Sequence, residues 1–128
     1  MIHLLLIDDD SLLRDTLRDR LRADGYEVTV TTNPFDALGI YGAMPTDLVI
    51  TDIYTPEFDN LVTIGALRKI SADLRVIAIS QGVGVKGRAF LRTARSYGVA
   101  RIFTTPVQLV DLLTAINELL EPGSARDT

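Results

Sequence analysis

The chain has 128 residues, enough for one domain with a buried core, and its composition of 47% hydrophobic and 23% charged residues is that of a globular protein. The absence of cysteine excludes a disulfide scaffold, a cysteine metal site and a thiol nucleophile. A single histidine, His3, cannot form a multi-histidine zinc site, and we expect it to be structural. No apolar run is long enough to cross a bilayer, and the N-terminus lacks the basic region of a signal peptide.

Short apolar runs alternate with amphipathic segments in the first half of the chain. Strands are expected there at 2–7 and 26–31, and helices at 12–24 and 34–43. The first helix has Asp10 or Ser11 as its N-cap and Gly25 just after its end. The second begins with Asn33 as N-cap and Pro34 at the first helical position.

The second half continues the alternation. Three strands and three helices are expected there, with strands at 47–51, 75–80 and 99–103 and helices at 60–72, 87–97 and 106–120. Pro106 is placed to open the last helix. We therefore expect one domain over 1–121 and a flexible C-terminal tail over 122–128.

Five strands that alternate with five helices predict an α/β fold, a doubly wound parallel sheet with helices on both faces. In the flavodoxin-like strand order 2-1-3-4-5, ligands bind at the carboxyl ends of strands 1 and 3, where the winding direction reverses. Asp8, Asp9 and Asp52 stand at those two strand ends. Three converging carboxylates repel one another unless a cation joins them, and oxygen ligands without histidine or cysteine favour Mg²⁺ or Mn²⁺. The alternative is that these aspartates only cap turns and helices, as Asp10 is expected to do.

Ser80 ends the fourth strand beside the same predicted crevice and offers a hydroxyl donor. Carboxylates, a hard cation and a hydroxyl together support transfer of a phosphoryl group onto a carboxylate.

Over residues 2–120 the sequence resembles a response-regulator receiver domain of two-component signalling. The resemblance lies in Leu-Leu-Ile-Asp-Asp-Asp-Ser at 5–11, Thr-Asp-Ile-Tyr-Thr-Pro at 51–56, Ser80 after an apolar strand, and Thr-Pro at 105–106. It implies a stand-alone, cytoplasmic receiver that signals by protein contact, is not an enzyme in the turnover sense, and binds neither nucleic acid nor membrane.

The resemblance also implies roles for individual residues. Asp52 would accept a phosphoryl group from a sensor histidine kinase or a histidine phosphotransfer protein. Mg²⁺ would be held by Asp8, Asp9, Asp52 and the main-chain carbonyl of Tyr54. Ser80 would bond a phosphoryl oxygen and report phosphorylation to a downstream protein, on the face formed by the helix at 87–97, the strand at 99–103 and the last helix.

Several positions depart from the family pattern. Thr105 replaces the usual lysine before the strand-5 proline and cannot supply its charge; we expect it to cap the helix that Pro106 opens. Gln81 replaces a small residue after Ser80. Ile102 occupies the usual aromatic switch position, with Phe103 beside it as a core residue, and Asn60 replaces a glycine. We therefore expect phosphorylation to be weakened.

Two alternatives to a phosphorylated receiver stay open. One is a pseudo-receiver that binds partners without phosphate. The other is a nucleotide sensor that uses Gly82-Val83-Gly84-Val85-Lys86-Gly87, which matches G-x-G-x-x-G, although no acid follows about 20 residues later to hold a ribose. The simpler interpretation of these glycines is a flexible loop.

Charge and hydrophobicity also suggest surfaces for partners. The net charge is −4, yet the segment 74–110 has six basic and no acidic residues. Arg88, Arg92 and Arg95 form one helical stripe, either a solvated face or a docking site for an acidic partner. The last helix is apolar over a wide face, which suggests a homodimer or output-domain contact.

Overall fold

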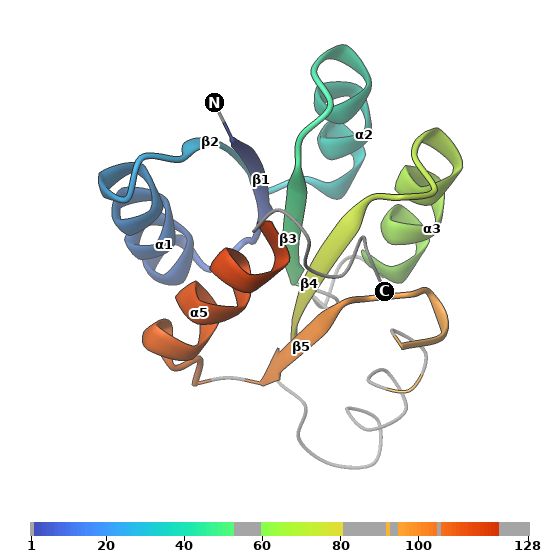
Figure 1. The fold of residues 1–128 in the computed structure, drawn as a ribbon. Helices are drawn as coiled ribbons and strands as arrows, with labels where there is room; N and C mark the ends of the chain where they lie inside the picture. Colours follow the sequence, from blue (N-terminus) through green and yellow to red (C-terminus); the bar gives the residue numbers. More distant parts are fainter. Residues whose placement is uncertain (1, 53–59, 81–91, 93–94, 105, 121–128) are drawn as a thin grey trace.

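The computed structural model describes residues 2–52, 60–80, 92, 95–104 and 106–120. Five parallel strands form one sheet in the order β2-β1-β3-β4-β5 (Figure 1). The strands are β1 (His3–Ile7), β2 (Glu27–Thr31), β3 (Leu48–Asp52), β4 (Arg75–Ser80) and β5 (Arg101–Thr104). The predicted fold class and strand order are confirmed, and this order makes β1, β3 and β4 the central strands.

Four helices with complete bounds flank the sheet. They are α1 (Ser11–Ala23), α2 (Pro34–Ala43), α3 (Asn60–Ile70) and α5 (Leu109–Leu120). Asp10 caps α1, its carboxylate accepting the main-chain N–H groups of Leu12 and Leu13, and Asn33 caps α2 in the same manner. Of the predicted helix at 87–97, residues 92, 95 and 96 are helical, Tyr97 lies in a turn, and residues 87–91, 93 and 94 lie outside the described residues.

The two faces of the sheet bury separate cores. α1 and α5 cover one face and α2 and α3 the other (Figure 1). The α1/α5 core contains Leu4, Leu17 and Ile116, whereas the α2/α3 core contains Leu5 and Ile64. Alternate residues of the apolar strand β1 therefore serve opposite faces, as the sequence predicts for a strand buried on both sides.

Two element boundaries in the last third differ from the prediction. The last helix begins at Leu109 rather than Pro106, and its first helical bond runs from the Leu112 N–H to the Gln108 carbonyl. The prediction that Pro106 opens this helix is therefore wrong, and Val107 packs against the α1/α5 core before the helix starts. Thr105, expected to cap the helix at Pro106, lies outside the described residues. β5 spans 101–104 rather than 99–103, because Val99 and Ala100 pack into the cores ahead of the paired residues.

α3 ends at Ile70, two residues before its predicted end. The chain turns there, with the Leu74 N–H bonded to the Ser71 carbonyl at 3.3 Å. This turn allows Leu74 to enter the α2/α3 core just before β4.

Arg68, near the end of α3, ties three segments together through main-chain carbonyls. Its Nη1 donates to the carbonyls of Ala72 and Leu74, at 3.1 and 2.6 Å. Its Nε and Nη2 donate to the carbonyls of Tyr97 and Gly98, at 2.8 and 2.6 Å. One guanidinium thus fixes the end of α3, the approach to β4 and the approach to β5 through four hydrogen bonds, which its planar arrangement of N–H donors allows.

Replacing Arg68 should therefore destabilise the whole domain. We expect Arg68→Met to lower the free energy of unfolding by about 2 kcal/mol, measured by urea denaturation, because four carbonyls lose a charged donor. The control is Lys69→Met, which removes an exposed base from the same helix. Equal stability of the two variants would contradict this role.

Candidate functional site

The register of the central strands brings the predicted acidic residues together. Ile7 of β1 pairs with Thr51 of β3, so Asp8 and Asp52 are the next residues along two adjacent parallel strands. The side-chain oxygens of Asp8, Asp9 and Asp52 lie within 4.8 Å of one another. The predicted convergence at the switch point is thus present in the fold.

Burial differs among the three aspartates. Asp8 is only 3% exposed, Asp52 is partly buried and Asp9 is exposed. The Asp8 carboxylate accepts the main-chain N–H of Asp10 at 2.8 Å, and Arg14 donates to the Asp8 carbonyl at 3.4 Å. These bonds hold the turn between β1 and α1 and aim a fixed carboxylate into the site.

Burial raises the pKa of the Asp8 carboxyl from 3.8 to about 6. The main-chain N–H of Asp10 opposes this shift, since it stabilises the carboxylate, and the charges of Asp10 and Asp9 add to it. A buried carboxylate among other acids is costly, and a cation in the site would offset that cost.

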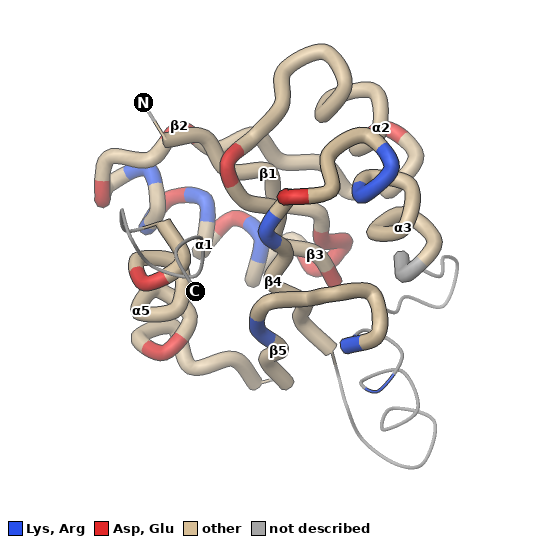
Figure 2. Tube along the Cα trace, turned by 45° about the vertical axis from the view of Figure 1, so that its right-hand side comes forward, with Lys and Arg blue, Asp and Glu red and all other residues tan. Residues whose placement is uncertain are grey.

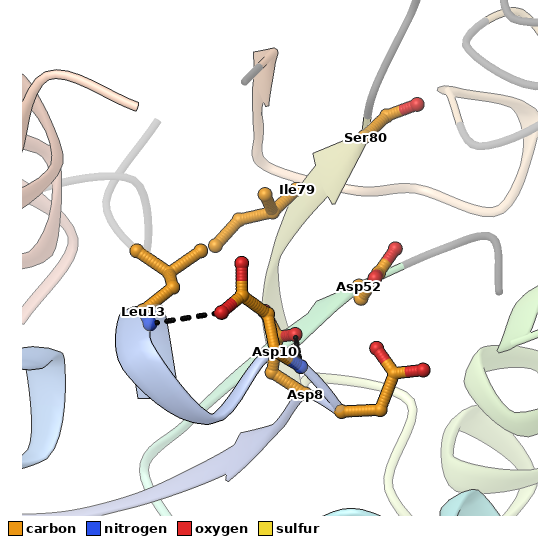
Figure 3. Close-up of a pocket in the computed structure, with 7 residues that line it drawn as sticks. Asp8, Asp10, Leu13, Asp52, Ile79 and Ser80 are labelled. Atoms are coloured by element: carbon orange, nitrogen blue, oxygen red, sulfur yellow. Dashed lines mark hydrogen bonds between the residues drawn. The ribbon is translucent and has the colours of Figure 1, made fainter. Parts of the chain in front are cut away.

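The three aspartates line a pocket at the carboxyl edge of the sheet (Figure 3). Seven residues line it: Asp8, Asp9, Asp10, Leu13, Asp52, Ile79 and Ser80. Its volume of about 70 Å³ suits an ion with its waters and is far below that of a typical cofactor pocket. Ser80, buried at the end of β4, reaches the same pocket as Asp52, as the sequence predicts.

Sequence reasoning missed part of this pocket. It assigned Asp10 only to the cap of α1, yet Asp10 is also among the residues that line the pocket, and Leu13 and Ile79 add apolar residues to the lining. The run of three aspartates was the available signal for Asp10. Leu13 and Ile79 carry no comparable signal, because both also belong to the packing of the α1/α5 core.

Other predicted residues have mixed outcomes. Tyr54, Gln81, Arg88, Thr105, the loop at 82–87 and the tail at 122–128 lie outside the described residues. Arg92 and Arg95 are exposed, as expected for a solvated or docking face. Phe103 packs against the α1/α5 core, as predicted, whereas Ile102 packs against the α2/α3 core.

His3 has a structural role, as predicted. Its ring Nε2 forms a 2.7 Å hydrogen bond with the Thr29 hydroxyl, and its main-chain N–H donates to the Asp47 carboxylate at 2.8 Å. These contacts join β1 to β2 and to the segment before β3, at the opposite end of the strands from the pocket.

The wide apolar face of α5 is largely used inside the molecule. Leu112, Ile116 and Leu119 are buried, and Leu109, Leu113 and Leu120 are partly buried against the α1/α5 core. Packing inside the molecule therefore accounts for most of the apolar face of α5 that suggested a homodimer or output-domain contact. Within the described residues, no helix is long and apolar enough to span a membrane.

Solved structures similar to this chain are receiver domains. The non-phosphorylated HemR receiver domain from Leptospira biflexa matches with a TM-score of 0.83 and 25% identity, covering 95% of this chain and 96% of that one. The response regulator TrrA from Thermotoga maritima, solved in complex with Mg²⁺ and BeF, matches with a TM-score of 0.78 and 27% identity. That match covers 94% of this chain and all of TrrA.

Curated relatives are longer regulatory proteins. The transcriptional regulatory protein GlrR of Escherichia coli K12 is 30% identical over 95% of this chain, which spans 27% of GlrR. The response regulator MprA of Mycobacterium sp. strain KMS is 27% identical over 96% of this chain, which spans 52% of MprA.

The model of the response regulator receiver domain matches residues 4–117. With the sheet order and the aspartate cluster in place, this match over most of the sequence shows that the chain belongs to the response regulator receiver domain family.

Proposed function

We propose that Asp52 accepts a phosphoryl group from the phosphohistidine of a sensor kinase or of a histidine phosphotransfer protein. The observation that carries the proposal is the meeting of Asp8, Asp9 and Asp52 in one pocket that also reaches Ser80. Membership of the receiver family supports it, as does the similarity to TrrA, which was solved with Mg²⁺ and BeF.

The donor set fits a hard divalent cation. Three carboxylates with oxygens within 4.8 Å of one another, and no histidine or cysteine among them, suit Mg²⁺. Asp8, Asp9 and Asp52 would hold it, together with the main-chain carbonyl of Tyr54 that the family pattern adds. When bound, Mg²⁺ neutralises negative charge on the phosphoryl group that is transferred.

The residues of the chain have separate tasks in the transfer. An Asp52 oxygen forms the new bond to phosphorus as the phosphorus–nitrogen bond of phosphohistidine breaks, and the released imidazole takes a proton from solvent. The Ser80 hydroxyl donates a hydrogen bond to a phosphoryl oxygen after transfer. No external substrate is turned over, since the phosphoryl group stays on Asp52 until water removes it.

Exposed apolar residues at the edge of the sheet that carries the pocket support a protein as donor. Leu12, Phe35, Val62 and Val110 are 79%, 68%, 68% and 74% exposed, and each lies in the first turn of a helix. Those first turns stand at the carboxyl edge of the parallel sheet, where the pocket opens. Apolar contacts beside an acidic pocket suit a docking protein, in the cytoplasm where sensor kinases present phosphohistidine.

Output would use the face formed by residues 87–97, β5 and α5. Basic positions lie beside β5 in Figure 2. Arg92 and Arg95, which precede β5 in the chain, and Arg101, its first residue, are all exposed. With Arg88 they would attract an acidic downstream protein or a second copy of the receiver. The relatives GlrR and MprA are much longer than this chain, and the proposal concerns the receiver part alone.

A phosphate-independent pseudo-receiver is the second candidate. Threonine at position 105 favours it, because the family's usual lysine would bring a positive charge to the phosphoryl group. Among the described residues that line the pocket, four are acids and none is basic. The nucleotide-sensor alternative stays a prediction, since its loop at 82–87 lies outside the described residues.

Phosphorylation of Asp52 can be tested directly. We expect incubation with Mg²⁺ and acetyl phosphate to add the mass of one phosphoryl group, measured on the intact protein. Asp52→Asn should gain none, and EDTA should prevent the gain in the wild type. If the wild type gains no mass with any donor while Mg²⁺ binds, and partner binding survives Asp52→Asn, the pseudo-receiver is favoured instead.

Restoring the lysine should accelerate the reaction. We expect Thr105→Lys to be phosphorylated roughly tenfold faster than the wild type, since a cation near the transferred group lowers the barrier. The matched control is Thr105→Met, which adds length without charge. A wild-type rate equal to that of Thr105→Lys would contradict weakened phosphorylation.

Cation binding should depend on the protonation of Asp8. Because its pKa in the folded state is about 6, against an ordinary 3.8, the folded protein holds this proton more tightly than the unfolded chain. Without a cation, the free energy of unfolding should therefore fall as the pH rises from about 4 to 6. Mg²⁺ offsets the loss, so it should raise the melting temperature by several degrees at pH 8 and much less at pH 5. Asp8→Asn should abolish the difference, and equal Mg²⁺ effects at both pH values would argue against this role of Asp8.

A further inference from the structure

Asp10 has contacts that serve the fold and a position that serves the site. Its Oδ1 accepts the N–H groups of Leu12 and Leu13, at 3.1 and 3.2 Å, and so caps α1. Its main-chain N–H donates to the Asp8 carboxylate at 2.8 Å. Asp10 is also one of the residues that line the pocket with Asp8 and Asp52 (Figure 3).

The cap alone does not require an acid. Asparagine and serine cap helices about as well as aspartate, because one oxygen that accepts the N–H groups of the first turn is sufficient. Asp10 adds a fourth acidic residue to a pocket lined by Asp8, Asp9 and Asp52, and none of the described residues that line it is basic. The charge of Asp10 acts on this pocket, since it is one of the causes that raise the pKa of the Asp8 carboxyl. A charge that destabilises the Asp8 carboxylate also destabilises a further anion that enters the same pocket.

We propose that Asp10 is a charge-selective residue of the phosphorylation site, which strengthens cation binding and slows phosphoryl transfer from free, doubly charged donors. The role in donor selection depends on the function proposed above. A small anion has only the cation and its own few contacts to offset the repulsion from Asp10. A donor carried by a protein could also contact the exposed apolar residues at the same edge of the sheet, so Asp10 favours the protein-borne donor over free acyl phosphates.

Two variants separate the charge from the cap. Asp10→Asn and Asp10→Ser both keep an N-cap oxygen and the main-chain bond to Asp8 while they remove the charge. Asp10→Asn also keeps the size of the side chain, and Asp10→Ser shortens it. The matched control is Asp19→Asn, which makes the same change in net charge on the same helix, at an exposed residue paired with Arg18. Thermal denaturation of each variant verifies that α1 and the domain stay folded.

The first measurement is phosphorylation of Asp52 at saturating Mg²⁺, followed by intact mass, with two donors of different charge. With acetyl phosphate, the oxygen–phosphorus bond breaks, acetate leaves and Asp52 gains the phosphoryl group. We expect Asp10→Asn to react roughly five- to tenfold faster with doubly charged acetyl phosphate and roughly twofold faster with singly charged phosphoramidate. The acceleration should shrink in high salt, and Asp19→Asn should match the wild type.

The second measurement is Mg²⁺ affinity by calorimetry, which requires no phosphorylation. We expect Asp10→Asn and Asp10→Ser to bind Mg²⁺ roughly three- to tenfold more weakly than the wild type and Asp19→Asn. Unchanged Mg²⁺ affinity together with equal acceleration for both donors would overturn the proposal and leave Asp10 as a helix cap. If no protein is phosphorylated by any donor, yet Asp10→Asn weakens Mg²⁺ binding, the proposed phosphoacceptor function fails while the charge of Asp10 is shown to act in the pocket.

Discussion

The pairing of β1 with β3 at the centre of the sheet is the constraint on which the site depends. Both strands are buried on two faces, so their register is fixed by packing on the α1/α5 and the α2/α3 side at once. A slip of one residue would turn every core side chain to the wrong face and separate Asp8 from Asp52. The position of the carboxylates is therefore a consequence of core packing. The hydrogen bonds of the β1–α1 turn then fix the orientation of Asp8.

The cost of this arrangement falls on Asp8. Its burial and its acidic neighbours raise its pKa to about 6. Near neutral pH, Asp8 is therefore ionised in surroundings that disfavour the charged form, and this lowers the stability of the fold. Hydrogen bonds within the β1–α1 turn offset only part of that cost. A cation bound among these carboxylates would offset the cost of burying Asp8, so cation binding would stabilise the folded protein.

The part of the site that would contact a phosphoryl group lacks positive charge among the described residues that line it. Leu13 and Ile79 give the pocket an apolar wall, and the position at which the family usually has a lysine carries a threonine. Four acidic residues in the lining would attract a cation, whereas the lysine that would bring positive charge to a phosphoryl group is missing. In the proposed function, Asp10 would increase this imbalance, and the exposed apolar residues on the first turns of the helices would give a protein donor binding energy that a small anion lacks.

The sequence by itself determined the alternation of elements, the strands buried on two faces, the caps at Asp10 and Asn33, and the acidic residues at the ends of β1 and β3. These features are local, since each depends on periodicity or on residues a few positions apart. The tertiary structure decided where α5 and β5 begin, because Val107, Val99 and Ala100 are placed by cores formed from distant segments. It also decided the contacts of Arg68 with carbonyls up to 30 residues away, the raised pKa of Asp8 and the place of Asp10 in the pocket lining. Burial and through-space charge depend on which distant atoms become neighbours, and only the folded chain defines those neighbours.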